Sequence, residues 1–144
     1  MSEENVNLIL SLYPAGDPDW VQLIHDDDMW AAQVEAWSSS FHVDFECVWH
    51  HFGGERHYAG LDGLRVFMLD WTTPWVTYRI DVEETIDLGG RVLVLNNDCG
   101  RREGSAKDVR GRLATLWTMR DGKVSRLDTY ETRADGLRAA GLPE

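Results

Sequence analysis

Four segments with strand-like alternation fill the second half of the chain, and they constrain its fold more than any other feature. They cover residues 76–83, 91–102, 109–119 and 123–131. Short turn sequences separate them, namely Gly89-Gly90, Gly104-Ser105 and Asp121-Gly122, and Asp-Gly is a strong hairpin signal. Because connections this short join antiparallel neighbours, the pattern predicts a meander of long antiparallel strands.

Helical patterns dominate the first half. Apolar residues recur at helical spacing in four stretches, which are Val6–Tyr13, Trp20–Ile24, Trp30–Trp37 and Leu61–Trp71. A strand is predicted over residues 41–51 between the third and fourth of these, followed by a loop at Gly53-Gly54. A short helix over 134–140 is predicted near the end of the sequence. This order predicts an α+β fold, with helices on one face of a curved sheet and residues 1–144 forming one domain.

Acidic residues precede three of the predicted helices. Asp17 is predicted to cap the second helix, with Pro18 at its first position. The triplet Asp26-Asp27-Asp28 could suggest a metal site, but its place before an apolar stripe favours a helix cap. Asp62 is predicted to cap the fourth helix.

Charge and composition exclude several classes of protein. The formal net charge is −11, which argues against binding to nucleic acid or to an anionic membrane surface. No apolar run is long enough to span a bilayer, and the first residues are acidic where a signal peptide is basic. We therefore expect a cytoplasmic protein. Cys47 and Cys99 have no metal or redox spacing and are expected to be reduced thiols, with a bridge between them left open.

Four short sequence segments resemble those of a known family. MSEENV at the start, YAGLDGLRVF at 58–67, LWTMRDGKVSRLDTY at 116–130 and LRAAGL at 137–142 resemble the SnoaL-like branch of the nuclear transport factor two superfamily. The resemblance implies a cone-shaped roll, in which a strongly curved, mixed and mostly antiparallel sheet wraps around helices and an apolar pocket. It also implies cofactor-free proton transfer by a carboxylate or histidine, and a homodimer through the sheet.

The resemblance also points to particular site residues. The strand from Arg91 turns polar at Asn96, Asn97 and Asp98, and Asp98 matches a catalytic carboxylate of epoxide-hydrolase members. Asn96 stands where those members have arginine. A second family carboxylate falls on Thr129, with Asp128 one residue early. Since successive strand residues face opposite sides, Asp128 is expected to point outward and to pair with Arg126 or a strand neighbour. A bulge that turns it inward is the alternative.

Several aromatic and polar residues are candidates for the wall of the pocket. His51 shares a face with Trp49 and is a candidate acid-base partner of Asp98; the alternative is a solvated histidine at a strand end. Trp49, Trp75 and Trp117 are expected to form walls, or else ordinary core. The family register implies that Thr115 and Leu113 face the same pocket. The histidines near Glu55 fit no zinc pattern, so neither a metal nor a cofactor is expected.

Two main classes of function follow from these candidate site residues. The first is a small enzyme doing acid-base chemistry as a cyclase, isomerase, dehydratase or hydrolase on a hydrophobic substrate. In this class Asp98 is the acid or base, and Asn96 and Thr129 hydrogen-bond the substrate. The second is a non-catalytic binding protein for an apolar small molecule, which the absence of a second carboxylate favours. A dimeric accessory protein with a filled cone and an exposed apolar sheet face is a third possibility.

Overall fold

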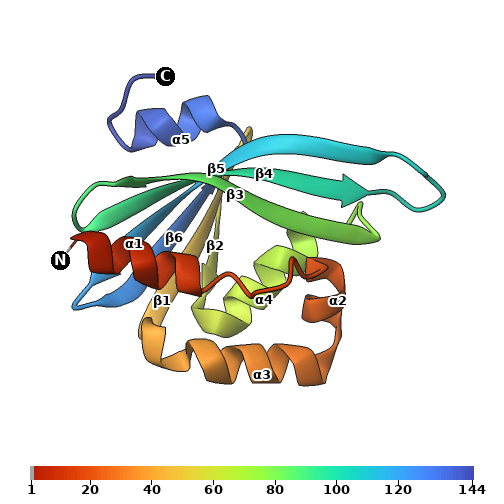
Figure 1. The fold of residues 1–144 in the computed structure, drawn as a ribbon, viewed down its shortest axis with the longest axis horizontal. Coiled ribbons are helices and arrows are strands. Elements are labelled where there is room, and N and C mark those ends of the chain that lie inside the picture. Colours follow the sequence, from red (N-terminus) through yellow and green to blue (C-terminus); the bar gives the residue numbers. More distant parts are fainter. Residues whose placement is uncertain (1) are drawn as a thin grey trace.

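The computed structural model describes residues 2–144, and Met1 lies outside the described residues. Helices dominate the first half of the chain and strands dominate the second half (Figure 1). The helices are α1 (Ser2–Ser11), α2 (Trp20–His25), α3 (Asp27–Trp37), a short 3₁₀ helix η1 (Ser38–Ser40), α4 (Gly60–Trp71) and α5 (Arg133–Ala139). The strands are β1 (Phe41–His51), β2 (Gly54–Ala59), β3 (Thr77–Asp87), β4 (Arg91–Arg101), β5 (Asp108–Arg120) and β6 (Lys123–Tyr130).

The strands form one curved, open sheet in the order β2-β1-β6-β5-β4-β3. Strands β3 to β6 make the expected antiparallel meander. Strand β1 joins it by pairing in parallel with β6, and β2 pairs antiparallel with β1 at the edge. The predicted α+β class with a curved, mixed and mostly antiparallel sheet is therefore confirmed.

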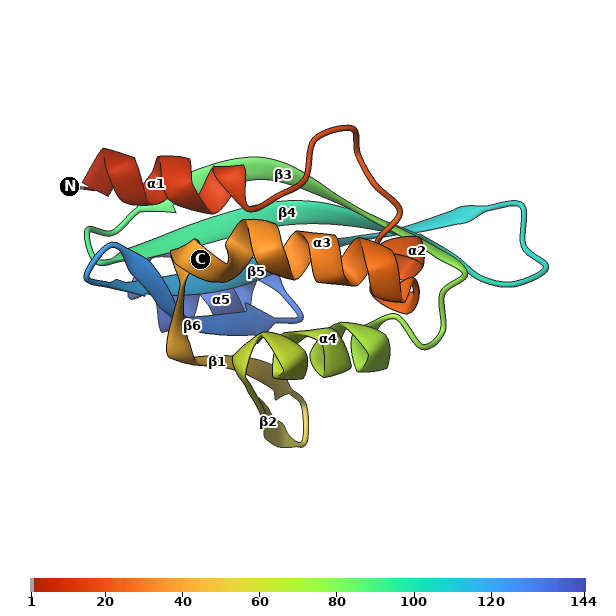
Figure 2. The same cartoon turned by 90° about the horizontal axis from the view of Figure 1, so that it is seen from below.

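The helices divide between the two faces of this sheet. Figures 1 and 2 show α1 to α4 on the concave face and α5 alone on the convex face. The larger apolar core lies on the concave side, where Trp20, Trp37, Phe45 and Trp117 are buried. A smaller core lies under α5, around Leu93, Leu95, Ala114, Leu116 and Ala140. Both apolar faces of the buried strand β4 are covered in this way, which explains why its sequence begins with an unbroken apolar run.

Two predicted caps are wrong and one is confirmed. Asp19, rather than Asp17, caps α2, and its carboxylate accepts from the Val21 amide at 3.0 Å. Asp17 instead lies in the turn before the helix with a positive φ of 50°. Asp62 lies inside the first turn of α4, whose cap position is Ala59. The acidic triplet behaves as predicted, since Asp26 accepts from the amides of Asp28 and Met29.

Strand β2 is the element that the sequence pattern missed. The loop predicted at Gly53-Gly54 is a tight turn, and the chain continues into β2 and pairs back on β1. The burial of β2 is confined to Tyr58, so its sequence lacks the apolar alternation that identifies a half-buried strand. An edge strand with charged side chains on both faces gives no such signal.

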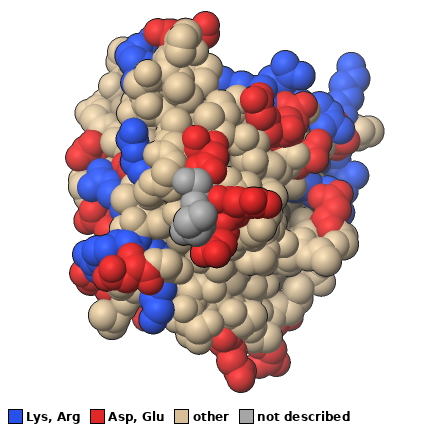
Figure 3. Space-filling model, turned by 60° about the vertical axis from the view of Figure 1, so that its left-hand side comes forward, with Lys and Arg blue, Asp and Glu red and all other residues tan. Residues whose placement is uncertain are grey.

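The described residues bear on two further expectations, which concern the cysteines and membrane-spanning helices. Cys47 and Cys99 are both free, and they lie on opposite faces of the sheet in β1 and β4. None of the helices within residues 2–144 is both long and apolar enough to cross a membrane. On the face shown in Figure 3, acidic and basic side chains stand in small mixed groups around uncharged surface.

Candidate active site

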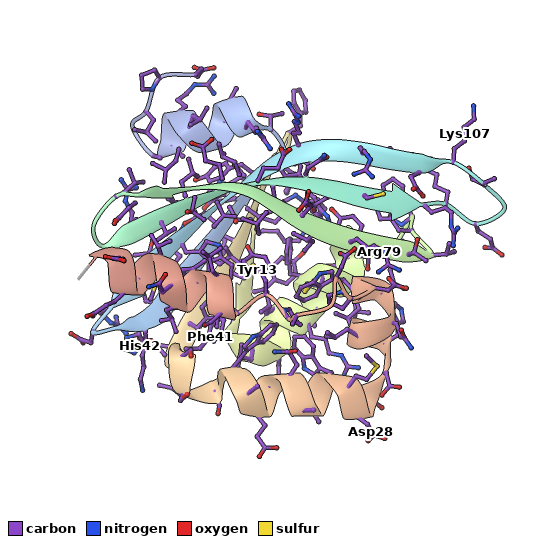
Figure 4. The ribbon with its side chains drawn as sticks, in the orientation of Figure 1. Tyr13, Asp28, Phe41, His42, Arg79 and Lys107 are labelled. Carbon is purple, nitrogen blue, oxygen red and sulfur yellow. The ribbon has the colours of Figure 1, made fainter. Side chains whose placement is uncertain are left out.

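An apolar cavity of about 90 Å³ lies between the concave face of the sheet and the helices. Its sheet residues come from β1, β3, β4, β5 and β6. The segment just after α1 and the helices α2, α3 and α4 close it from the other side. Figure 4 places Tyr13, just after α1, on this side of the sheet. The lining is almost wholly aromatic and aliphatic, and its polar members are Tyr13, Tyr78, Asn96, Asp98, Thr115 and Thr129.

Asp98 is the one carboxylate among the described residues that line this cavity. Only 5% of the surface of Asp98 is exposed. The Tyr78 hydroxyl donates to Oδ2, and the Asn96 amide nitrogen donates to Oδ1 at 2.5 Å. The Trp71 indole N–H in turn donates to the Tyr78 hydroxyl oxygen at 2.7 Å. The expected burial of Asp98 is confirmed, and the strand from Arg91 turns polar because it enters a cavity, not because it reaches solvent.

Burial raises the pKa of Asp98 from 3.8 to about 6. The hydrogen bonds from Tyr78 and Asn96 favour the charged form and lower the pKa, but they offset only part of the desolvation. The pKa of Tyr78 is raised, chiefly by burial and then by the neighbouring negative charge of Asp98. The carboxyl group therefore changes protonation near neutral pH, while the tyrosine stays a neutral donor.

Two fully covered polar atoms of cavity-lining residues have no hydrogen-bond partner in the described part of the chain. They are Asn96 Oδ1 and Thr129 Oγ1, on residues that are 3% and 5% exposed. The orientation of the Asn96 amide follows from Asp98, because an ionised carboxylate only accepts and the amide nitrogen must face it. The carbonyl oxygen is thus left as an unused acceptor.

A second, more open hollow of about 350 Å³ adjoins the cavity. Trp49, Trp71 and Trp75 form its aromatic walls. Four residues line both spaces, and these are Trp71, Tyr78, Asp98 and Leu113. Asp98 therefore lines both a small inner cavity and a larger outer hollow.

Gly100 sets the position of one wall of the outer hollow. A Cβ atom at this position would lie 2.5 Å from the ring of Trp75, closer than any side chain allows. The absence of a side chain on β4 thus lets the indole pack directly on the strand. Arg102, just after the end of β4, stacks over the Trp75 ring at 5.2 Å from its centroid.

The structure distributes the sequence-predicted residues over these two spaces. Asn96, Asp98, Leu113, Thr115, Trp117 and Thr129 line the inner cavity, whereas Trp49 and Trp75 line only the outer hollow. Thr115 lies directly opposite Thr129 in the β5–β6 register, and its hydroxyl accepts from the Trp117 indole at 3.0 Å. The wall and polar positions predicted on β4, β5 and β6 thus share one concave face.

His51 is not brought to Asp98. Its Nδ1 accepts from the Gly53 amide at 3.2 Å, and its ring packs against Trp49. No hydrogen bond within residues 2–144 joins His51 to Asp98, whose two oxygens are engaged by Tyr78 and Asn96. The structure does not bring the proposed histidine–aspartate pair together, because His51 lines neither the inner cavity nor the outer hollow.

Asp128 lies on the outer face, as expected from its one-residue offset. Arg126 donates to both of its oxygens at 3.0–3.1 Å, and His50 approaches Oδ1 at 2.7 Å. The alternative of a bulge that turns Asp128 inward is excluded, since Thr129 takes the inward position. The carboxylate is nevertheless buried, with 6% of the residue exposed, because α5 and Tyr130 lie close to this face.

Sequence pattern alone does not indicate Tyr78 and Trp71 as partners of Asp98. It predicts the strand over residues 76–83 but not the register of that strand against β4. In the structure Tyr78 pairs with Gly100 and Ile80 with Asp98, so Tyr78 lies diagonally next to Asp98 on the same face. The short turn at Gly89-Gly90 does not reveal this register, because a bulge between Val82 and Glu84 shifts the pairing by one residue before Tyr78 is reached.

The described residues contain no group of three or more His, Cys, Asp or Glu side chains placed to hold a metal ion. The histidines near Glu55 are instead engaged in pairs on the outer face, where His57 contacts both Glu46 and Glu55. The arrangement around Asp98 is thus one carboxyl group with two neutral donors in an apolar cavity, which can bind a small molecule and move a proton.

Comparison with known proteins agrees with the architecture. The family model of the SnoaL-like domain matches residues 18–127. No curated protein matches the sequence.

Solved structures show the same fold at low sequence identity. A candidate SnoaL-like polyketide cyclase from Jannaschia sp. CCS1 superposes with a TM-score of 0.68 at 19% identity, covering 99% of this chain and 95% of its own. TerC, co-crystallised with polyporic acid, gives a TM-score of 0.62 at 22% identity, covering 96% and 98%. A ketosteroid isomerase-like protein from Catenulispora acidiphila DSM 44928, in complex with trimethylamine, gives 0.55 at 18% identity, covering 81% and 95%.

Proposed function

The chain belongs to the SnoaL-like domain family, and from that premise we propose that it is a cofactor-free enzyme in which Asp98 transfers a proton on a hydrophobic substrate. The family includes cyclases and isomerases. The observation that carries the proposal is the environment of Asp98, whose pKa is raised to about 6 in an apolar cavity next to a hollow large enough for a substrate. A general base is most effective when its pKa lies near the working pH.

The neighbours of Asp98 support a base and not a nucleophile. The carboxylate takes a proton from a carbon next to a carbonyl group, and the electron pair moves onto the carbonyl oxygen as an enolate. The protonated carboxyl group then returns the proton to a second carbon, which completes an isomerisation. In a cyclisation the enolate carbon instead attacks a second carbonyl carbon of the substrate, and the carboxyl group gives its proton to the oxygen of that carbonyl. Tyr78 and Asn96 hold the carboxylate in place through both steps, since each donates to one of its oxygens.

The size of the two spaces sets which substrates are suitable. The inner cavity of about 90 Å³ is smaller than the cavity of about 150 Å³ that is known to admit benzene. The outer hollow of about 350 Å³ falls in the range of small-molecule sites. We therefore place the body of the substrate among the outer tryptophans, with only a small group inserted past Asp98. TerC, co-crystallised with polyporic acid, is a precedent for a bound small molecule in this fold.

Hydrogen exchange tests the proposal without knowledge of the natural substrate. A panel of cyclic enones and aromatic ketones is incubated with the protein in D₂O, and uptake of deuterium next to the carbonyl is followed by mass spectrometry. We expect the protein to accelerate exchange in at least one compound, and Asp98→Asn to reduce that rate by about 10²- to 10⁴-fold.

Asp128→Asn is the matched control, because it alters a buried carboxylate on the opposite face of the sheet. Circular dichroism verifies that each variant is folded. Equal exchange by wild type and Asp98→Asn would contradict the proposal.

A non-catalytic binding protein is the second candidate. Thr129 stands where a second carboxylate would complete a two-carboxylate site, and this favours binding without turnover. A binding protein predicts ligand-induced stabilisation that survives Asp98→Asn, together with no exchange in wild type.

A further inference from the structure

The hydrogen bonds that connect Trp71, Tyr78 and Asp98 run in one direction. The Trp71 indole N–H donates to the Tyr78 hydroxyl oxygen at 2.7 Å, and the Tyr78 hydroxyl donates to Asp98 Oδ2. An indole nitrogen can only donate, whereas a tyrosine hydroxyl can both donate and accept. The indole therefore takes one acceptor position of the hydroxyl and leaves the hydroxyl hydrogen to point at the carboxylate.

Aromatic packing holds the Trp71 indole in this orientation. Trp71 is the last residue of α4, and its ring meets the ring of Trp49 on β1 edge-on, with the centroids 5.4 Å apart. The ring of Phe67, one turn earlier in α4, lies 5.9 Å away on a tilted plane. Side chains from two elements thus fix the direction of the indole N–H, as a preorganised donor requires.

The effect of Trp71 on Asp98 passes through the Tyr78 hydroxyl. The pKa of Asp98 is raised by burial and lowered by its hydrogen bond from Tyr78. The pKa of Tyr78 is likewise raised by burial and by the charge of Asp98, and lowered by its hydrogen bond from Trp71. Because hydrogen bonds in a chain polarise one another, a hydroxyl that accepts from the indole donates more strongly to the carboxylate.

The direction of the chain also disfavours the protonated carboxyl group. Without the indole N–H, the Tyr78 hydroxyl could turn its hydrogen toward water in the outer hollow, which it also lines, and accept the proton of Asp98. With the indole in place, this reversal is opposed at the hydroxyl oxygen. Trp71 therefore favours the charged form of Asp98 in two ways, although it does not contact the carboxylate through a hydrogen bond of its own.

Other titratable and charged groups near Asp98 are less well placed to set its protonation. Asp70 and Glu131 line the outer hollow as exposed side chains, so water and salt screen their charges. Arg110 pairs with Cys99 in the β4–β5 register, so its side chain belongs to the opposite face of the sheet. Burial keeps Tyr13 on the inner cavity neutral by raising its pKa.

We propose that Trp71 is a positioning residue for the proton transfer, which acts through Tyr78 to keep Asp98 in its charged, proton-accepting form at neutral pH. This inference rests on the proposed role of Asp98 as a base. It gives Trp71 a part in the reaction beyond forming a wall of the outer hollow.

The test measures the protonation of Asp98 directly, in the full chain and without substrate. The ¹³C signal of the Asp98 carboxyl group is assigned from its loss in Asp98→Asn and followed by NMR from pH 4 to pH 8.5. The wild-type midpoint should lie near 6. We expect the midpoint to rise by about 1–2 pH units in Tyr78→Phe, and by about 0.3–0.6 in Trp71→Phe.

The sign of the change separates positioning from a merely structural role. A smaller ring at position 71 admits water, and hydration by itself lowers the pKa of a buried carboxyl group. Loss of the donor chain raises it. A midpoint in Trp71→Phe that stays unchanged or falls would therefore overturn the proposal.

A double variant tests whether Trp71 acts through Tyr78. In the Tyr78→Phe background the hydroxyl is already absent, so adding Trp71→Phe should move the midpoint by less than about 0.2 pH units. A rise as large as in the wild-type background would show that Trp71 acts by another route and would overturn the proposal.

Trp30→Phe is the matched control, because it makes the same change at a buried tryptophan of the concave core that lines neither space. Its midpoint should equal that of wild type, and a rise as large as in Trp71→Phe would contradict a specific role for Trp71. Thermal unfolding verifies that each variant folds.

The outcome is separable from that of the proposed function. A raised midpoint in Trp71→Phe, with no hydrogen exchange by wild type, would reject the enzyme and keep the control of Asp98 by Trp71. Exchange that depends on Asp98, with an unchanged midpoint in Trp71→Phe, would do the reverse. If both proposals hold, the pH profile of exchange should move upward in Trp71→Phe by the same amount as the midpoint.

Discussion

Two hydrogen-bond donors, Tyr78 and Asn96, hold Asp98 in place, but they do not fully offset the free-energy cost of burying its charge. The desolvated carboxyl group has a pKa of about 6 in the folded protein, against 3.8 as its usual value. A raised pKa means that the folded state binds this proton more tightly than the unfolded chain does. The associated stability is fully present below about pH 3.8 and is lost as the pH rises through 6.

The first prediction therefore concerns stability against pH. Asp98→Asn removes this titration, so the free energy of unfolding of the variant relative to wild type should increase by about 3 kcal/mol between pH 3.5 and pH 7.5. Urea unfolding at both pH values measures it. An unchanged difference at the two pH values would show that Asp98 titrates normally in the folded protein.

The second prediction uses two threonines that face each other across β5 and β6. Thr129 Oγ1 is unpartnered, whereas Thr115 Oγ1 accepts from the Trp117 indole N–H. In the free protein, Thr129→Val should raise the free energy of unfolding by about 1 kcal/mol because it removes an unsatisfied hydroxyl. Thr115→Val should lower it by about 1–2 kcal/mol because it leaves the indole N–H unpaired.

Denaturant unfolding at pH 7.5 compares the two variants directly. Loss of stability in Thr129→Val would indicate that its hydroxyl has a partner in the folded protein.

The third prediction is the pH dependence of turnover. A base must be ionised to accept a proton, so hydrogen exchange catalysed by the protein should rise with pH and level off above about 6. Initial rates between pH 4.5 and 8 measure the profile. A rate that rises as the pH falls would assign Asp98 the role of an acid.

The sequence located part of this site for a physical reason. Alternation along a strand is strict, so a family register anchored at one residue places Asn96, Asp98, Thr115 and Thr129 on the same face together. Tyr78 was missed because it reaches Asp98 across a strand pair, and alternation within one strand carries no information about the register of its neighbour. His51 was misassigned although β1 has the predicted bounds, because alternation within a strand does not show that β6 and β5 lie between β1 and β4 in the sheet.

At the scale of elements, α5 packs unusually close to the sheet. A Cβ atom at Gly136 would lie 2.3 Å from the Ala114 Cβ on β5. Two residues without large side chains thus allow the helix to rest on the strand and to cover Leu93 and Leu116.

The fourth prediction follows from this contact. Gly136→Ala should destabilise the protein by about 1–3 kcal/mol, because overpacking against a strand outweighs the better helix propensity of alanine, about 1 kcal/mol. Chemical denaturation measures the loss. Gly90→Ala is the control, since a Cβ there meets nothing within 4 Å at an ordinary φ. A Gly136→Ala protein as stable as wild type would mean that α5 can lift from the sheet at little cost.

The elements differ in how well the sequence predicted them. Long amphipathic stretches such as β4 and α3 have many residues that repeat the same signal, so single exceptions do not hide them. Helix starts depend on one side chain, and the choice between Asp17 and Asp19 is made by the positive φ in the turn before α2, which sequence spacing does not reveal. Strand β2 is defined by backbone pairing at a polar edge.

For the whole molecule, we propose a homodimer that uses the outer face of β1 and β2 together with the exposed Arg126 of β6, since α5 packs against the outer face of β4, β5 and β6. The uncovered region carries Glu46, Glu55, His57 and Arg126, all at least partly exposed. This is not the exposed apolar face that an accessory protein would need.

The fifth prediction is that association depends on salt. Ion pairs between exposed groups are screened as ionic strength rises. Sedimentation equilibrium should therefore give a dimer dissociation constant that increases between 50 mM and 500 mM NaCl. A monomer in both buffers, or a dimer insensitive to salt, would contradict the proposed surface.

The parallel pairing of β1 with β6 also determines when the protein can fold. Residues that are adjacent in the sheet, such as Val48 and Asp128, are separated by most of the chain, and loops of this length close slowly. On a ribosome that adds about 5–20 residues per second, β1 emerges several seconds before its partner strand. During that interval its apolar residues Phe45 and Cys47 have no sheet to join, and the cavity around Asp98 cannot exist until synthesis has passed Tyr130.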